Sequence, residues 1–222
     1  MGRLQDQLDQ ITRQTRQLLP PKLMEPGERD IAELFASGIE KRILPVGGMA
    51  PEFSLQDNNG RMVRSTDLLA LGPLIVTFFR GRWCPYCMAE LEAWRDFYPT
   101  VRARGALLVA ISPQTIHQND LLIQKYLPRF PVLSDVGSAV AESFGLAYTL
   151  SEHRQKAYRS TMVNLPFLNG DPSWRLPLPA TFLVQPDGFI AFAQAHADFR
   201  VRPEPEDVLA VLDHENSRNL KI

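Results

Sequence analysis

Apolar residues recur at helical spacing in two stretches near the start of the chain. In residues 4–19 they return every three, four or seven positions, while Gln, Arg and Asp occupy the other faces. This pattern predicts an amphipathic helix with one apolar side: Leu4, Leu8, Ile11, Leu18 and Leu19. After the Pro20-Pro21 break, residues 28–43 predict a second helix. Its apolar side consists of Ile31, Leu34, Phe35, Ile39 and Ile43.

The first of these helices has two possible packing partners. Leu4, Ile11 and Leu18 follow one another in seven-residue steps, which is the spacing of a coiled coil that pairs two chains. Two heptads are too few to define a coiled coil, so we expect the helix to pack on its own domain. A homodimer remains an alternative.

From Gly47 onward, short apolar runs alternate with helical patterns and with Gly or Pro punctuation, as in a mixed sheet with crossover helices. Residues 73–79 are continuously apolar and rich in β-branched and aromatic side chains, which predicts a central strand. A long helical pattern follows, with Leu91, Trp94, Phe97, Tyr98 and Val101 on one side. Further along we expect strands at 106–111 and 132–133, and helices at 115–126 and 137–144.

The last third of the chain breaks this rhythm once. Residues 148–175 are polar at first and then rich in Asn, Pro and Gly, which indicates an insertion beside the sheet. We expect this insertion to border the active site. Pro186-Asp-Gly188 predicts a hairpin between strands at 181–185 and 189–193, before a closing helix at 206–212. We therefore divide the chain into a helical extension (1–46), one α/β domain (47–216) and a tail (217–222).

Composition excludes several classes of function. The 222 residues are 45% hydrophobic and 22% charged, with a net charge of −1, so the basic excess needed to bind nucleic acid is absent. The first 19 residues contain charged and amide side chains throughout, unlike a secretory signal or a membrane span. We expect a cytoplasmic protein without a membrane partner.

The chain contains two cysteines, Cys84 and Cys87, two residues apart. They cannot form the disulfide framework of a small secreted protein. A structural zinc site needs four Cys or His ligands, whereas the four histidines are single and scattered. The pair lies where the central strand passes into the long helix, a location that favours redox chemistry over inert buried thiols.

A helix start activates a cysteine because its first N–H groups are unpaired and stabilise an anion. A thiol there can have a pKa well below the usual ~8.5. Arg80 and Arg82 add positive charge nearby, and Pro85 suits the first helical position, where an N–H is not needed. The two-residue spacing lets the second sulfur resolve a mixed disulfide formed at the first.

Five segments in order resemble the peroxiredoxin-like (AhpC/TSA, redoxin) branch of the thioredoxin superfamily, over about residues 47–212. They are Gly48-Met-Ala-Pro51-Glu-Phe53-Ser-Leu55, Phe78-Phe79-Arg-Gly-Arg-Trp-Cys-Pro-Tyr-Cys87, Gly105-Ala-Leu-Leu-Val-Ala-Ile-Ser112, Phe130-Pro-Val-Leu-Ser-Asp135 and Pro179-Ala-Thr-Phe-Leu-Val-Gln-Pro-Asp-Gly188. The resemblance implies a thioredoxin-like α/β fold with a central mixed sheet flanked by helices. It also implies reduction of peroxides with electrons from a thiol such as thioredoxin or glutathione.

The catalytic positions depart from the peroxiredoxin pattern Pro-x-x-x-Thr/Ser-x-x-Cys. An ungapped match places Cys87 at the peroxidatic cysteine, Arg80 at the proline and Cys84 at the threonine. Sulfur is a weaker hydrogen-bonding group than a hydroxyl. Trp83-Cys-Pro-Tyr-Cys87 instead resembles the thioredoxin and TlpA-like motif, in which Cys84 attacks and Cys87 resolves.

Pro179 stands where many peroxiredoxins carry an arginine, and it resembles the cis-proline that thioredoxins hold against their cysteines. The alternative is an ordinary loop proline before an edge strand. Trp83 either shields the sulfurs or covers the core. Weaker candidates are Arg202 and Asp198, which either bind an anion or pair with each other, and we expect surface ion pairing. His117 and His196 are candidate proton shuttles. Because each is a lone histidine, we expect a structural role for both.

The sequence thus predicts an oxidoreductase that cycles Cys84 and Cys87 between dithiol and disulfide. Its substrate is a peroxide or, alternatively, a protein disulfide. A second alternative is a redox sensor or binding module without turnover. No cofactor motif is visible, which agrees with chemistry that sulfur performs unaided.

Overall fold

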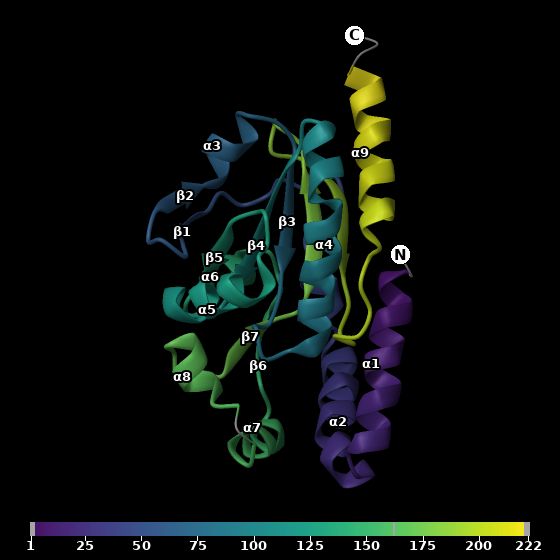
Figure 1. Cartoon of the computed structure of the whole chain (residues 1–222), viewed down its shortest axis with the longest axis vertical. Helices are drawn as coiled ribbons and strands as arrows, with labels where there is room; N and C mark the ends of the chain where they lie inside the picture. The colour runs from purple at the N-terminus through teal and green to yellow at the C-terminus, as the bar shows by residue number, and fades with distance from the viewer. Residues whose placement is uncertain (1–2, 162, 220–222) are drawn as a thin grey trace.

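The computed structural model describes residues 3–161 and 163–219. Seven strands form one sheet in the order β2-β1-β5-β4-β3-β8-β9, with helices on both faces (Figure 1). Its strands are β1 (Ser54–Asp57), β2 (Met62–Arg64), β3 (Leu74–Phe78), β4 (Leu107–Ser112), β5 (Val132–Ser134), β8 (Ala180–Val184) and β9 (Ile190–Ala195). This is the mixed, thioredoxin-like sheet that the sequence predicts.

Strand β3 occupies the centre of this sheet. It pairs in parallel with β4 and antiparallel with β8, and all five of its residues are buried. The continuous apolar run explains this burial, because a strand that is covered on both faces has no solvent-facing side on which polar residues would alternate with apolar ones. The predicted hairpin is present as β8 and β9, with an irregular register between Leu183 and Val184.

The helices divide between two apolar cores. The bounds are α3 (Ser65–Leu69), α4 (Pro85–Ala103), α5 (Ile116–Tyr126), α6 (Ala139–Ser143) and α9 (Pro205–Asn219). One core joins α4, α9 and the start of the chain through Leu8, Trp94 and Leu212. The other lies on the opposite side of the sheet around Phe144 and Phe182. Helix α9 runs well past residue 212, so the helix is longer than predicted and includes residues assigned to the tail.

The two N-terminal helices lie side by side, as α1 (Leu4–Leu18) and α2 (Pro21–Ser37), followed by a short 3₁₀ turn, η1 (Ile39–Arg42) (Figure 1). Helix α1 packs on α4 through buried Leu4 and Leu8, as expected. Leu18 is wrongly predicted to pack, because it is 80% exposed at the end of the helix.

The second helix begins seven residues earlier than predicted and also ends earlier. Pro21 is its first residue, where proline is tolerated because that N–H has no helical partner. Gly38, in the left-handed region at φ 68°, ends it. Phe35, expected on the buried side, is exposed and packs edge-on against His196.

The segment at 148–175 holds two helices, α7 (Glu152–Arg159) and α8 (Leu165–Asn169). A separate two-stranded sheet pairs β6 (Ala147–Thr149) with β7 (Arg175–Pro177). This segment borders the cysteine region, as expected, because the Tyr158 ring of α7 packs edge-on against Trp83 at 5.3 Å. Among the described helices, none is long and apolar enough to cross a membrane.

Candidate active site

A short loop connects β3 to α4 and carries the cysteine pair. Cys84 is the N-cap residue of α4, and Pro85 is the first helical residue, as predicted. Gly81 in this loop has φ 142°, and a Cβ there would lie 2.6 Å from the Trp83 indole nitrogen. Only glycine therefore fits where the chain turns tightly under Trp83.

The two sulfur atoms lie together at the start of the helix. The thiol of Cys87 donates to Cys84 Sγ at 2.7 Å, and the backbone N–H of Cys87 donates to the same sulfur at 3.4 Å. Both cysteines are free and completely buried. Because the sulfurs are already in contact, the dithiol can close to a disulfide with little movement of the backbone.

Arg80 provides the charge beside Cys84. Its Nη2 donates to Cys84 Sγ at 3.2 Å, and the residue is 3% exposed. The guanidinium lies 3.8 Å from the Phe199 ring centroid and 5.2 Å from that of Trp83. The aromatic rings exclude water from the cation, which strengthens its attraction for a thiolate. Arg82 plays no such part, since its side chain donates to Gln118.

The two thiols have pKa values shifted in opposite directions. Burial raises the pKa of Cys84, but the hydrogen bond from Cys87 and the charges of Arg80 and Arg202 outweigh it and lower that pKa to about 5. Burial, the hydrogen bond to Cys84 and the charge on that sulfur raise the pKa of Cys87 well above its usual value. The site therefore holds a thiolate at Cys84 and a thiol at Cys87.

A buried ion pair lies on the far side of Cys87. Arg202 Nε donates to Glu90 Oε2 at 2.7 Å, with both side chains almost fully buried, and Arg202 Nη2 lies 3.9 Å from Cys87 Sγ. The expectation of a surface ion pair at Arg202 and Asp198 is wrong. Asp198 pairs with Arg200 instead, because the chain turns at residues 198–201, where the Val201 N–H donates to the Asp198 carbonyl at 3.1 Å, whereas Arg202 follows the turn and is buried beside Glu90.

Glu90 is a functional candidate that the sequence analysis missed. Burial raises its pKa to about 7, against the opposing charge of Arg202. Thr77 and Thr181 donate to its Oε1, each at 3.5 Å. The sequence does contain a pattern that points to Glu90. It follows Cys87 by three positions, so the two side chains lie on the same face of the helix.

The remaining predicted residues have different outcomes. Trp83 both covers the Arg80 guanidinium and packs against Tyr158. Pro179 precedes β8, next to the end of β3, but no described residue has a cis peptide bond, so the cis-proline interpretation is wrong. The edge-strand alternative is also wrong, because β8 lies between β3 and β9. His196 accepts from the Asp198 backbone, away from the sulfurs.

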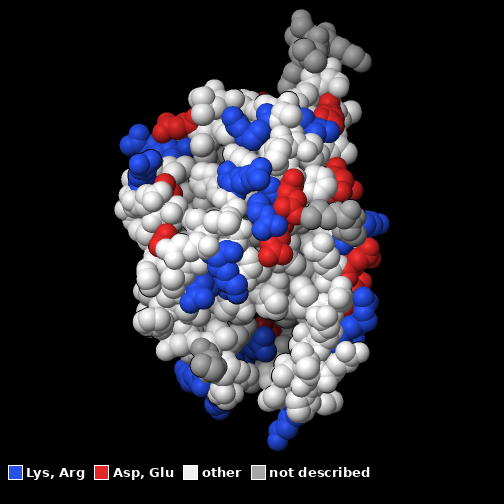
Figure 2. Space-filling model, in the orientation of Figure 1, with Lys and Arg blue, Asp and Glu red and all other residues white. Residues whose placement is uncertain are grey.

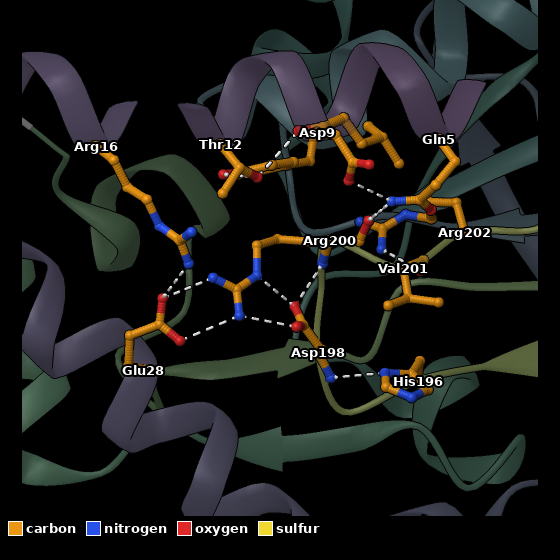
Figure 3. Close-up of polar contacts among 12 residues, drawn as sticks. Gln5, Asp9, Thr12, Arg16, Glu28, His196, Asp198, Arg200, Val201 and Arg202 are labelled. Atoms are coloured by element: carbon orange, nitrogen blue, oxygen red, sulfur yellow. Dashed lines mark hydrogen bonds and ion pairs between the residues drawn. The ribbon is translucent and has the colours of Figure 1, made fainter. Parts of the chain in front are cut away.

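The segment between β9 and α9, residues 196–204, covers the site and connects it to the N-terminal helices. Arg200 forms a two-pronged ion pair with Glu28 of α2 at 2.6 and 3.1 Å, and another with Asp198 at 2.8 Å (Figure 3). Glu204 accepts from the first N–H groups of α1. Phe199, between these anchors, lies over Arg80.

No set of three metal-ligating side chains among the described residues includes either cysteine. The surface around the site is mixed in charge: Figure 2 shows Lys and Arg interspersed with Asp and Glu over the visible face. These observations describe a buried dithiol between two guanidinium groups, which is a site for sulfur redox chemistry.

Fold and site together define a thioredoxin-like protein with an activated cysteine pair. The model of the AhpC/TSA family matches residues 46–193, about two thirds of the chain, and the chain belongs to this family. Its relatives include two kinds of thiol oxidoreductase, in agreement with the thiol-dependent redox function that the sequence predicts.

Two relatives and one solved structure of the same fold illustrate the range. The thiol-disulfide oxidoreductase ResA of Geobacillus thermodenitrificans is 26% identical, over 67% of this chain and 68% of its own. The chloroplastic peroxiredoxin Q of Sedum lineare is 32% identical over 45% of this chain, which spans about half of that relative (53%). The solved structure of peroxidoxin BcpB from Mycobacterium tuberculosis shares the fold at a TM-score of 0.61, with 21% identity over 77% of this chain and 97% of its own.

Proposed function

We propose that the protein is a thiol-disulfide oxidoreductase in which Cys84 attacks and Cys87 resolves. The observation that carries this proposal is the division of protons between the two sulfurs. The pKa of Cys84 is lowered to about 5, whereas that of Cys87 is raised. A cysteine that is ionised at neutral pH is the nucleophile, and its protonated neighbour waits to act second.

In the first step the Cys84 thiolate attacks one sulfur of a substrate disulfide. A mixed disulfide forms, and the other substrate sulfur leaves as a thiolate that takes a proton from solvent. The negative charge on Cys84 is then lost. Because that charge helps to raise the pKa of Cys87, its loss makes the Cys87 thiol easier to deprotonate.

In the second step Cys87 must lose its proton and attack Cys84 Sγ. Glu90, with a pKa of about 7, is the buried carboxylate available to accept this proton, and Arg202 contacts both groups. The Cys84–Cys87 disulfide forms and the second substrate thiolate leaves. A dithiol reductant then returns two electrons to the pair and is itself oxidised to a disulfide, and Cys87 regains one proton, which restores the Cys84 thiolate and the Cys87 thiol.

Peroxide reduction by the same dithiol is the second candidate. Three buried donors beside the site, Arg80 Nε, Trp83 Nε1 and Gln114 Nε2, have no hydrogen-bond partner among the described residues. They suit the oxygen atoms of a small hydroperoxide. Cys84 would attack the peroxide to give a sulfenic acid and an alcohol or water, and Cys87 would then displace water to form the disulfide. The raised pKa of Cys87 disfavours its acting first.

Turnover of an insulin-type disulfide and of hydrogen peroxide, each with excess dithiothreitol, separates the two candidates. We expect the disulfide to be reduced at the higher kcat/KM. Faster peroxide consumption that requires Cys84 would replace the first candidate by the second. Loss of neither activity in Cys84→Ser would contradict both.

We further propose that a cellular thiol such as thioredoxin or glutathione is the reductant and that the protein works in the cytoplasm. The reaction needs a donor of two electrons, and thiols remain reduced there. Leu18 and Leu23, exposed where α1 meets α2, favour a homodimer. Light scattering of the reduced and oxidised protein tests this last point.

A further inference from the structure

A buried carboxylate away from the cysteines lacks the partners that burial normally requires. Asp30 of α2 is 4% exposed. Within the described part of the chain it accepts one side-chain hydrogen bond, from Ser151 Oγ at 3.4 Å, and it forms no ion pair within 4.0 Å. Buried carboxylates are usually paired, multiply hydrogen-bonded or bound to a metal.

Two further ligating groups face Asp30. Glu33 lies one turn later on α2, and His153 is in the first turn of α7. One ligand atom of each of the three residues lies within 4.8 Å of the other two, and His153 Nδ1 is 3.9 Å from Glu33 Oε2. Ser151 Oγ, 3.3 Å from His153 Nε2, lies between the histidine and Asp30.

The place is accessible from solvent. A cavity of about 500 Å³ opens there, with Asp30, Glu33 and Ser151 in its wall. Figure 2 shows the surface hollowed in the region where α7 and α2 face each other in Figure 1, and charged side chains of both signs lie inside. A hydrated ion therefore has a path to the carboxylates.

We propose that Asp30, Glu33 and His153 bind a divalent cation of the zinc type, with a water molecule completing the site. Zinc takes nitrogen and carboxylate oxygen ligands at about 2.0–2.2 Å, so the three groups need to close by roughly an ångström. The imidazole selects against Mg²⁺ and Ca²⁺, which prefer oxygen ligands.

The surrounding charges set the strength of binding. Arg154 and Arg80 act on Asp30 through longer-range charge and oppose a cation. Arg29 donates to Glu33 Oε1 at 2.9 Å, which leaves Oε2 for the metal. We therefore expect micromolar rather than nanomolar affinity. The bound ion would join α2 to α7 and hold the N-terminal helices against the 148–175 segment.

Equilibrium dialysis of the oxidised protein against Zn²⁺ tests this site, because the disulfide removes the sulfurs of Cys84 and Cys87 as competing ligands. We expect one Zn²⁺ per chain and at least about tenfold weaker binding in His153→Gln and Asp30→Asn. His196→Gln is the matched control, since His196 also faces a glutamate, Glu40 at 4.0 Å, without a third ligand among the residues that the structure describes. It should bind Zn²⁺ like the wild type.

Three results would overturn the proposal: no Zn²⁺ binding below about 100 μM, equal binding by wild type and His153→Gln, or equal loss in His196→Gln. Mg²⁺ in place of Zn²⁺ should not bind. A Zn²⁺-dependent rise in the melting temperature of the wild type, absent in His153→Gln, is expected as a second readout. If Asp30→Asn fails to fold, His153→Gln still tests the proposal.

Discussion

Cys84 and Cys87 are the same residue type, one helical turn apart and equally buried, yet their surroundings make them chemical opposites. Cys84 caps the helix, receives three hydrogen bonds and faces Arg80 at 3.2 Å. Cys87 lies inside the first turn, donates a hydrogen bond to Cys84 and contacts the Arg202 guanidinium at 3.9 Å. Burial alone raises both pKa values, so the hydrogen bonds and the charges decide which thiol ionises.

The largest expected effect comes from removing either sulfur. Cys84→Ser should abolish turnover, by about a thousandfold or more, because a hydroxyl is not ionised at neutral pH. Cys87→Ser should keep the first attack and stop there, so that a mixed disulfide with the substrate accumulates. Mass spectrometry of the protein after one addition of substrate distinguishes the two. Accumulation of the adduct in Cys84→Ser instead would reverse the assignment.

Arg80→Met should raise the pKa of Cys84 by roughly 1–3 units, because an opposite charge within hydrogen-bonding distance is removed. The rate of reaction with a small disulfide at about pH 6 should then fall by between about twofold and about ninetyfold, according to the size of the pKa shift. Arg82→Met is the matched control, since its side chain contacts Gln118 rather than a sulfur. Equal losses in the two variants would refute a specific role for Arg80.

Glu90→Gln should slow the second step about tenfold or more while leaving the first attack unchanged, because the proton acceptor for Cys87 is lost. The inflection near pH 7 in the rate of resolution should disappear in this variant. Stopped-flow measurement of the release of the second substrate thiol follows the step. An unchanged inflection would assign it to another group.

The stability of the reduced protein should depend on pH more steeply than that of the oxidised protein. The pKa of Cys84 is lowered from 9.0 to about 5, so this group stabilises the reduced fold above pH 9 and loses that contribution as the pH falls toward 5. From pH 6 to 8 the difference between the two forms should rise by up to about 1.4 kcal/mol per unit.

Glu90 contributes in the opposite direction. Its pKa is raised from 4.5 to about 7, so stability is lost as the pH rises through that range. Burial, the largest cause of this shift, is common to both redox states, so the comparison between them largely cancels the contribution of Glu90. Urea titrations of the two forms at several pH values measure the difference, and parallel pH dependences would contradict the lowered pKa of Cys84.

The smallest expected effect is at the cover over the site. Glu28→Gln breaks the ion pair with Arg200 and should speed alkylation of the native protein by iodoacetamide a few-fold, with a change in stability of less than about 1 kcal/mol. Asp213→Asn is the control, because it breaks an ion pair with Arg104 that lies outside the cover, about two turns into α9. A similar gain in both variants would argue against local opening.

The elements that a short-range pattern determines were predictable. The apolar run of β3, the helix after the cysteines and the Pro-Asp-Gly hairpin all follow from local residue types. The bounds of α2 were not, because Pro21 suits a helix start as well as a break. Leu18 has the right spacing for burial, but it lies at the end of α1, where the described part of the chain leaves it 80% exposed.

In the candidate site, the spacing of the cysteines identified both sulfurs, whereas Arg80 and Arg82 were named equally and only Arg80 donates to a sulfur. The pair of Arg202 and Glu90 was missed because the two residues are 112 positions apart and only the tertiary fold brings them together. The interpretation of Pro179 failed for a related reason. The conformation of its peptide bond depends on packing that the family pattern does not encode.

The most direct test of the central claim is the pH dependence of thiolate absorbance in the reduced wild type, Cys84→Ser and Cys87→Ser. The structure predicts that one thiolate appears with a midpoint of about 5 in the wild type, that Cys87→Ser retains it, and that Cys84→Ser lacks it. A first midpoint near the ordinary 9.0, or a low midpoint that survives in Cys84→Ser, would contradict the assignment of Cys84 as the nucleophile.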